Sequence, residues 1–137
     1  VRSGELLMRR GRKTESAASR RARQHFTETV LERERCEIQD LIPHECGGGC
    51  FDACHVLPKR FIKRETNTWS EEDQIAAMWD VANGLKGCRV GHNLFDGAGH
   101  CGLTVEDLPA AAVRFAADYG WRFELEREYA GDRRMAA

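Results

Sequence analysis

The 137-residue chain contains no run of about 18 apolar residues, which is the length that a membrane-spanning helix needs. It therefore predicts no membrane span and no membrane partner. The apolar stretch at residues 6–8 is too short for the core of a secretory signal, so we expect a cytoplasmic protein. Internal repeats are also missing. Apolar residues make up 42% and charged residues 31% of the chain, which is typical of a single globular domain with one core.

A net excess of positive charge, a common mark of nucleic-acid-binding proteins, is missing too, because the formal net charge is −1. The distribution is uneven, however. Residues 1–64 carry 14 Lys and Arg against 9 Asp and Glu, whereas residues 65–137 carry 7 against 13. Residues 1–14 are predicted to form a basic, flexible arm. A neutral chain can present one basic face to phosphates, although an ordinary solvated basic tail is the alternative.

Six cysteines are present, at positions 36, 46, 50, 54, 88 and 101. An even number of cysteines in a secreted domain would indicate three disulfides. Without a secretory signal, and with five histidines in the same chain, metal ligation in a reducing compartment is favoured. Buried free thiols that pack as small apolar side chains remain a further alternative.

The apolar periodicity predicts several elements around these cysteines. A helix is expected over residues 15–35, short strands at 36–38 and 53–57, a helix that begins after Ser70, a short helix over 88–96, a helix that begins after Thr104 and a final strand over 121–127. Ser70 is a good N-cap, and the acidic residues that follow it suit a helix N-terminus. The expected fold class is α+β.

One pattern in the middle of the chain carries chemistry. His55 follows Cys54 in a short apolar run, Asn83 lies downstream, His92 comes nine residues after Asn83, and Asp96 follows four residues later. This order resembles the motif of the HNH endonuclease family, and the layout is similar to that of small phage and prophage HNH proteins. The resemblance implies a ββα-metal (His-Me finger) core at about residues 36–97, preceded by a helix and followed by a helix and a strand, in one nuclease domain over residues 15–137.

The resemblance also implies a role for each matching residue. His55 is the expected general base that activates water, and Asn83 is the expected brace that orients it. Cys54, His92 and Asp96 are the expected ligands of one divalent ion, namely Mg²⁺, Mn²⁺, Ni²⁺ or Zn²⁺. Taken alone, a histidine such as His55 is more often one held by a backbone carbonyl. Asn83 could also be a helix C-cap, a role that is compatible with that of a brace, and His92 with Asp96 could form a surface hydrogen bond.

Cys54 departs from the family pattern, in which Asp, Glu or His precedes the general base. A thiolate prefers softer ions such as Zn²⁺. Three outcomes are open: Cys54 binds the ion and shifts the metal preference, Asp52 replaces it after a small change of register, or the site is impaired.

Many HNH proteins also carry a structural zinc bound by two cysteine pairs. Cys36, Cys46 and Cys88 match three of these positions, but Gly91 stands where the fourth cysteine is expected. Cys101 is the predicted replacement, and Cys50, His100 and His44 are the other candidates.

Basic residues that flank the motif are expected to contact a DNA backbone without sequence specificity. They are Arg9, Arg10, Arg12 and Lys13 in the arm and Lys59, Arg60, Lys63 and Arg64 after the second strand. The sequence thus predicts a metal-dependent DNA endonuclease with phage packaging or replication proteins as further partners. It leaves the oligomeric state open. A zinc-containing DNA- or protein-binding module with an impaired nuclease site is the alternative, and a disulfide-stabilised secreted domain is a third.

Overall fold

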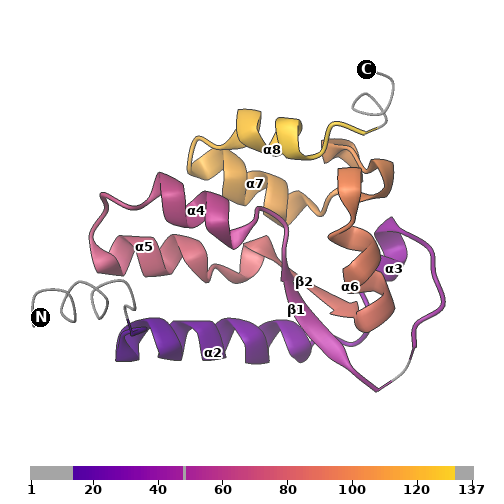
Figure 1. The fold of residues 1–137 in the computed structure, drawn as a ribbon, viewed down its shortest axis with the longest axis horizontal. Coiled ribbons are helices and arrows are strands. Elements are labelled where there is room, and N and C mark those ends of the chain that lie inside the picture. Colours follow the sequence, from indigo (N-terminus) through magenta and orange to yellow (C-terminus); the bar gives the residue numbers. More distant parts are fainter. Residues whose placement is uncertain (1–13, 48, 132–137) are drawn as a thin grey trace, which may run out of the picture.

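The computed structural model describes residues 14–47 and 49–131, and within them the chain is an α+β fold of helices around one two-stranded antiparallel sheet (Figure 1). The elements are α2 (Ala17–Leu31), α3 (Ile38–Leu41), β1 (Phe51–His55), α4 (Lys59–Glu65), α5 (Glu71–Met78), η1 (Val81–Asn83), β2 (Gly84–Cys88), α6 (Arg89–Phe95), η2 (Ala98–Gly102), η3 (Val105–Asp107), α7 (Ala110–Asp118) and α8 (Arg122–Glu128). Arg9, Arg10, Arg12 and Lys13 of the predicted arm lie outside the described residues. No helix in the described ranges is long and apolar enough to cross a bilayer.

The sheet pairs β1 with β2, so that Phe51 lies opposite Cys88 and His55 opposite Gly84. The predicted strand over residues 36–38 was wrong, because residues 38–41 form the short helix α3 with Ile38 buried. Three residues of mixed polarity are too few to distinguish the two periods. The true partner strand was missed because its sequence, Gly-Leu-Lys-Gly-Cys, is poor in residues that favour strands.

The two glycines of β2 allow its neighbours to approach the backbone closely. A Cβ atom on Gly84 would lie 2.7 Å from Val30 and 2.8 Å from Phe26 of α2, and one on Gly87 would lie 2.4 Å from Ile38. These contacts are shorter than side chains tolerate, so α2 and α3 pack directly on the strand. Glycine in a strand often marks such an approach.

Helix α2 begins at the N-cap Ser16 and lies along the sheet through Phe26 and Val30, both fully buried. Its C-terminal end is held by Lys86, whose ammonium group donates to the carbonyls of Leu31 and Arg33. Because helix ends leave carbonyls without partners, a cation here satisfies them and complements the helix dipole. The hairpin is thereby joined to α2.

Three further predictions concern helices. Ser70 caps α5 through a hydrogen bond from the Asp73 amide, and α6 follows β2 directly, as the spacing indicated. The final strand was wrong: residues 122–128 form α8, since Trp121, Leu125 and Tyr129 are buried at every fourth position while Phe123 is 65% exposed. Helices α7 and α8 therefore cover the opposite side of the core from α2 (Figure 1).

Candidate functional site

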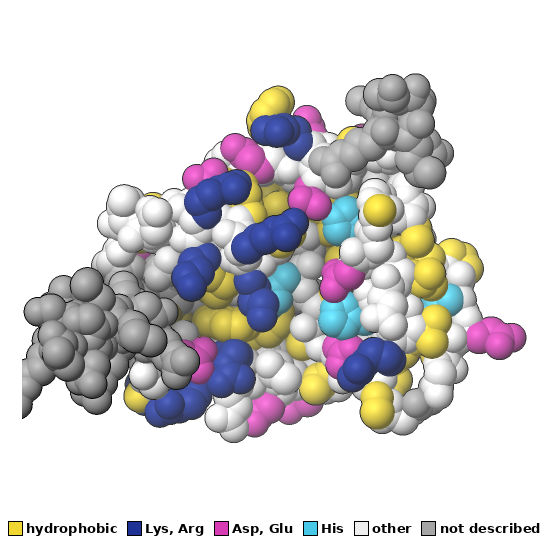
Figure 2. Space-filling model, viewed as in Figure 1, with side chains coloured by type: hydrophobic (Ala, Val, Ile, Leu, Met, Phe, Trp, Pro, Cys, Tyr) yellow, Lys and Arg dark blue, Asp and Glu magenta, His cyan; other side chains and the backbone are white. Residues whose placement is uncertain are grey.

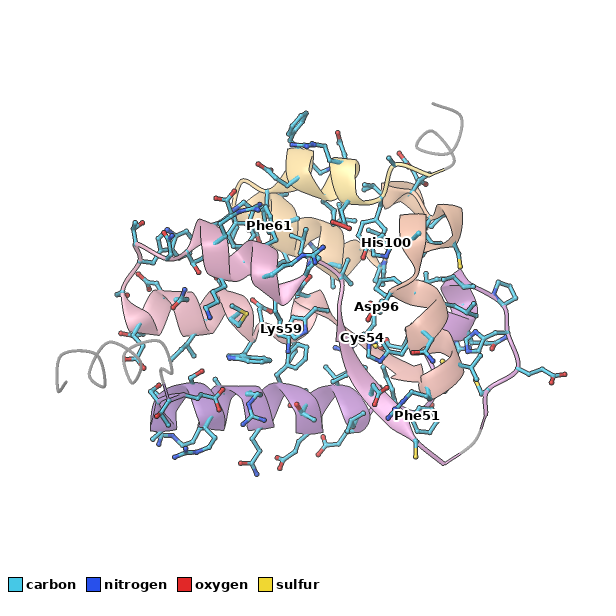
Figure 3. All side chains as sticks on the ribbon, viewed as in Figure 1. Phe51, Cys54, Lys59, Phe61, Asp96 and His100 are labelled. Atoms are coloured by element: carbon cyan, nitrogen blue, oxygen red, sulfur yellow. The ribbon has the colours of Figure 1, made fainter. Side chains whose placement is uncertain are left out.

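A cavity of about 720 Å³ opens between the C-terminal end of β1, α4, α6 and the turn that follows α6. Its polar lining consists of three histidines, two carboxylates, one thiol and two cations: His55, His92, His100, Asp96, Glu128, Cys54, Lys59 and Arg60. Figure 3 shows Cys54, Asp96, His100 and Lys59 around it. In Figure 2, the cations gather beside histidines and carboxylates on this face. Side chains distant in sequence thus share one cavity.

His55, at the end of β1, is fixed by three neighbours. Its ring stacks on Phe26 with centroids 4.5 Å apart and meets the edge of Trp79, while Nε2 lies 3.1 Å from the carbonyl oxygen of Met78. A carbonyl only accepts hydrogen bonds, so Nε2 carries the proton and Nδ1 is the basic nitrogen. Burial lowers the pKa of His55 to about 4, assisted by the charge of Lys59. The imidazole is therefore neutral at pH 7.

The depressed pKa of His55 predicts an acid-sensitive fold. In the unfolded chain His55 binds a proton below about pH 6.5, but in the folded chain only below about pH 4. The unfolded state binds more protons between these values, so stability falls as the pH drops from 6.5 towards 4, by about 3 kcal/mol. Urea unfolding at several pH values measures this, and His55→Gln should flatten that part of the profile. An equal pH dependence in parent and variant would contradict the assignment.

The segment after His55 is clamped by two residues. The side chain of Asn83 is fully buried; it accepts a hydrogen bond from the Leu57 amide at 2.8 Å and donates one to the Leu57 carbonyl at 3.0 Å. The backbone carbonyl of Asn83 accepts from the Val56 amide. The Tyr129 hydroxyl donates to the Val56 carbonyl. All four backbone polar groups of Val56 and Leu57 are thus paired. Asn83 and Tyr129 therefore fix the segment that follows His55, and the sequence did not indicate the contribution of Tyr129.

His92 of α6 lies between two carboxylates. Its Nδ1 is 2.8 Å from Asp52 on β1, and its Nε2 is 2.8 Å from Asp96 one turn later on α6. A carboxylate only accepts, so a neutral imidazole has one proton for two acceptors. The arrangement is complete with either a second proton on the ring or a cation between Nε2 and Asp96. The His92 ring and the Arg89 charge hold the pKa of Asp52 below its usual range, so Asp52 is ionised.

Cys54 is not placed as a ligand-ready thiolate. Its side chain is 2% exposed, and burial followed by the charges of Asp96 and Asp52 raises the pKa of the thiol. Within the described residues, the ligand atoms of Cys54, His92 and Asp96 do not all lie within 4.8 Å of one another. The structure therefore brings together His92 and Asp96, with a neutral Cys54 in the same cavity wall.

His100 and Glu128 form the wall opposite α4. His100 Nε2 lies 2.8 Å from Glu128, Nδ1 contacts the Phe95 carbonyl, and the ring stacks on Tyr129 at 4.2 Å. Burial opposes the charged form, but Glu128 and the carbonyl outweigh it and raise the pKa of His100. His100 and Cys101 have φ angles of 49° and 53°, a strained left-handed turn that these contacts hold. His100 therefore belongs to the cavity rather than to the cysteine cluster.

A second site lies where the end of β2 meets α3 and α6, and it contains Cys36, His44, Cys46 and Cys88, whose ligand atoms all lie within 4.8 Å of one another. His44 Nε2 is 3.6 Å from the sulfurs of Cys36 and Cys46 and 3.1 Å from that of Cys88. A tetrahedral zinc with Zn–S of about 2.3 Å and Zn–N of about 2.0 Å places sulfur and nitrogen roughly 3.6 Å apart. This Cys3His group can therefore hold a metal such as zinc.

The orientation of His44 supports ligation. Its Nδ1 donates to the Ile42 carbonyl at 2.6 Å, so the other ring nitrogen, Nε2, faces the three sulfurs. Such a hydrogen bond on the outer nitrogen is usual for metal-bound histidines. Gly91 stands where the fourth cysteine was expected, and its lack of a side chain explains how His44 can take the place of that cysteine. A Cβ atom on residue 91 would lie 2.7 Å from His44 Nε2, so the glycine leaves the space that His44 fills.

The surroundings of this group change the pKa values of Cys88 and Cys46 in opposite directions. Burial acts to raise the pKa of Cys88, but hydrogen bonds from the Gly91 amide, His44, Cys46 and the Gly47 amide lower it to about 6. The pKa of Cys46 is raised to about 11 by loss of solvation and by Cys88 and Cys36. One negative charge thus falls on Cys88, and a bound cation is required before Cys46 ionises near neutral pH as well.

Cys101, the predicted fourth ligand, lies elsewhere. Its exposed thiol contacts the carbonyl of Leu94, and His44 takes its place in the cluster. The sequence named His44 only as an alternative, because no spacing rule connects it to Cys88. Cys50 is exposed and is also outside the group. All six cysteines are free thiols in the structure.

Four of the predicted DNA-contacting cations, Lys59, Arg60, Lys63 and Arg64, lie on α4. Lys59 and Arg60 line the cavity, and Lys63 lines a neighbouring groove against α2 and α5. Arg64 packs over the ring of Phe61. Three of the four cations therefore follow one continuous surface beside His55.

Comparison with protein-family models, curated proteins and solved structures finds no match to this chain. The function is therefore inferred from the two sites themselves. One is a cavity with a fixed neutral histidine, a histidine–carboxylate pair and two cations. The other is a Cys3His group suited to a metal.

Proposed function

We propose that the protein is a metal-dependent nuclease of the HNH type that hydrolyses phosphodiester bonds of DNA with little sequence preference. The observation that carries the proposal is the placement of the neutral, carbonyl-anchored His55 in one cavity with the His92–Asp96 pair and the Lys59 and Arg60 side chains. Phosphodiester hydrolysis needs a base for water, a Lewis acid and cations for the phosphate, and these residues supply or bind all three.

The donor set of the cavity fits a hard divalent ion such as Mg²⁺ or Mn²⁺. His92 Nε2 and Asp96 Oδ2 are 2.8 Å apart, close to the separation of adjacent ligands at about 2.1 Å from an octahedral ion. Such an ion usually keeps several waters and binds few protein groups besides substrate phosphates. Asp52 then acts on the opposite ring nitrogen, where it holds the His92 proton on Nδ1 and leaves Nε2 free to bind.

The residues of the chain divide the remaining work. His55 Nδ1 accepts the proton of the attacking water, while the Met78 carbonyl keeps its proton on Nε2. Asn83 and Tyr129 hold the segment after His55 and so fix the direction of the ring. Lys59 and Arg60 contact the phosphates on either side of the reacting one. When bound, the ion polarises a phosphate oxygen. In this scheme β1, β2 and α6 are the ββα-metal core. A zinc ion in the Cys3His group links the end of β2 to the segment before β1 that contains Cys36, His44 and Cys46.

Plasmid nicking tests the proposal. We expect the zinc-loaded protein to relax supercoiled DNA with Mg²⁺ or Mn²⁺ and not with Zn²⁺ alone, because Asp96 is a hard oxygen ligand. Asp96→Asn keeps the size of the side chain and removes its charge, so it should lower the cutting rate at least tenfold and raise the Mg²⁺ concentration needed. Asp118→Asn is the matched control, because Asp118 is an exposed residue of α7 that lines none of the described cavities.

One observation favours a second function, a zinc-containing binding module. The only group of described residues whose ligand atoms all converge within 4.8 Å is Cys3His, and the cavity holds the neutral thiol Cys54 where a hard ligand is expected. A folded, zinc-loaded protein that binds DNA but cuts it with none of Mg²⁺, Mn²⁺, Ni²⁺ or Zn²⁺ would favour this module over the nuclease.

A further inference from the structure

Three neighbouring surface hollows of the protein share lining residues, and together they are called the trough. The groove between α2, α4 and α5 shares Lys59 and Arg60 with the cavity. The cavity in turn shares Ala53 and His92 with a third hollow, which lies on the other side of His92. A long ligand that crosses the cavity can therefore continue into either neighbour.

The charges along this trough alternate. The first groove is lined by Lys63, by Arg23 in its ion pair with Glu15, and by Glu71. Lys59 and Arg60 line its junction with the cavity, and Asp96 and His92 line the centre. Beyond His92, the third hollow carries Arg89, whose side chain is 66% exposed and is paired with Asp52. Cations thus stand on both sides of the carboxylate and imidazole centre, which is the order a polyanion needs if its reacting phosphate is to reach that centre.

Phe51 adds an aromatic face to the third hollow. Phe51 is 37% exposed as a residue and lines the hollow with Arg89, and the ammonium group of Lys86 lies 4.5 Å from the ring centroid. The lysine fixes the ring at the start of β1. Aromatic faces beside basic residues bind unpaired bases by stacking, and this stacking tolerates any base.

We propose that the hollow of Phe51 and Arg89 is a second nucleic-acid subsite, which binds one unpaired nucleotide beside the reacting phosphate. Phe51 stacks on its base and Arg89 binds its phosphate. A base within a duplex is already stacked on its neighbours, so the subsite selects single-stranded or frayed DNA. The inference rests on the proposed function for its polyanionic ligand and adds the preferred form of that ligand.

Binding without cleavage tests the subsite. Zinc-loaded protein carrying His55→Ala, with no other divalent ion added, is titrated into a fluorescein-labelled 20-nucleotide single strand and into the corresponding duplex, and anisotropy gives Kd. We expect tighter binding of the single strand. Phe51→Ala should raise its Kd about tenfold, the effect of one stacked base, and change duplex binding less. Phe51→Trp should restore the affinity, which separates stacking from damage to the fold.

The contribution of Arg89 is measured from the dependence of Kd on salt. Arg89→Ala should lower the slope of log K against log salt by about 0.7, the value for one phosphate contact on a single strand, and Arg89→Lys should restore it. Arg35→Ala is the matched control, because Arg35 pairs with Asp40 and lines none of the three hollows.

The outcomes separate the subsite from the proposed nuclease. If Phe51→Ala and Arg89→Ala both bind single strands like the parent, the subsite is refuted, and nicking by the wild-type protein would leave the nuclease standing. Suppose instead that both variants weaken single-strand binding as expected, but the wild-type protein fails to cut DNA with any of the tested ions. The subsite then stands and the nuclease proposal falls. Equal weakening by Phe51→Ala and Phe51→Trp would refute stacking.

Discussion

His55→Ala is expected to remove metal-dependent DNA cleavage, with a fall in rate of about 10²- to 10⁴-fold, the usual contribution of a general base. The reason lies in its placement: His55 is neutral at pH 7, its Nε2 proton is held by the Met78 carbonyl, and it lines the cavity with His92 and Asp96. Its low pKa makes it a weak base but keeps it fully deprotonated at neutral pH. Plasmid nicking in Mg²⁺ or Mn²⁺ measures the effect.

The control must separate chemistry from packing, because the His55 ring stacks on Phe26 and contacts Trp79. His55→Gln fills more of this space and still lacks a basic nitrogen, so both variants should lose cleavage while their circular dichroism stays native. His25→Ala, a change at an exposed histidine of α2, should cut like the parent. If His55→Ala nicks plasmid at the parental rate, His55 is not the base and the proposed mechanism falls.

The helix capped by Ser70 was predictable from sequence, and the strand expected over residues 53–57 overlaps β1, but the second strand was not predicted. Ser70 and the acidic residues after it marked α5, and the chain order placed α6 after residue 88. Strand β2 was not predicted because it contains Gly84 and Gly87, which disfavour strands. The close contacts of these glycines with α2 and α3 require them, and this tertiary requirement overrides strand propensity. Helix α8 was mistaken for a strand because Phe123 completes an alternating pattern, although it is exposed.

The site divides in the same way. Local spacing was enough to pair His92 with Asp96, because residues four apart meet on a helix. Contacts between distant segments left no such signal. Asp52 on His92, Tyr129 on Val56 and His44 among the cysteines all depend on how elements pack. Gly91 did carry a clue, since a glycine at a ligand position requires another side chain to enter its space.

Removal of a metal ion from the Cys3His group should lower the free energy of unfolding by more than any other change predicted for this protein. If zinc is present at 1,000 times its Kd, it stabilises the fold by about 4 kcal/mol, which corresponds to roughly 15 °C in Tm for a domain of this size. The group joins the segment before β1 to the start of α6, because Cys36, His44 and Cys46 precede the sheet and Cys88 ends β2. Chelation followed by thermal unfolding, with zinc content measured by mass spectrometry, tests this expectation.

Cys88→Ser is the sharpest variant, since serine can still cap α6 by accepting from the Gly91 amide, as the Cys88 sulfur does. Loss of zinc and of Tm would then report the missing ligand rather than a missing cap. Cys101→Ser is the matched control outside the cluster and should keep both. An unchanged zinc content in Cys88→Ser would contradict the assignment of Cys88 as a ligand.

Gly91→Ala gives an independent test, because it changes none of the four ligand residues themselves. The new methyl group would lie 2.7 Å from His44 Nε2, so His44 must move away from the three sulfurs. We expect weaker zinc binding and a Tm between those of the parent and Cys88→Ser. If His44 were merely a neighbour of three thiols, its displacement would leave the zinc content unchanged, and the fourth ligand would have to be water or another residue.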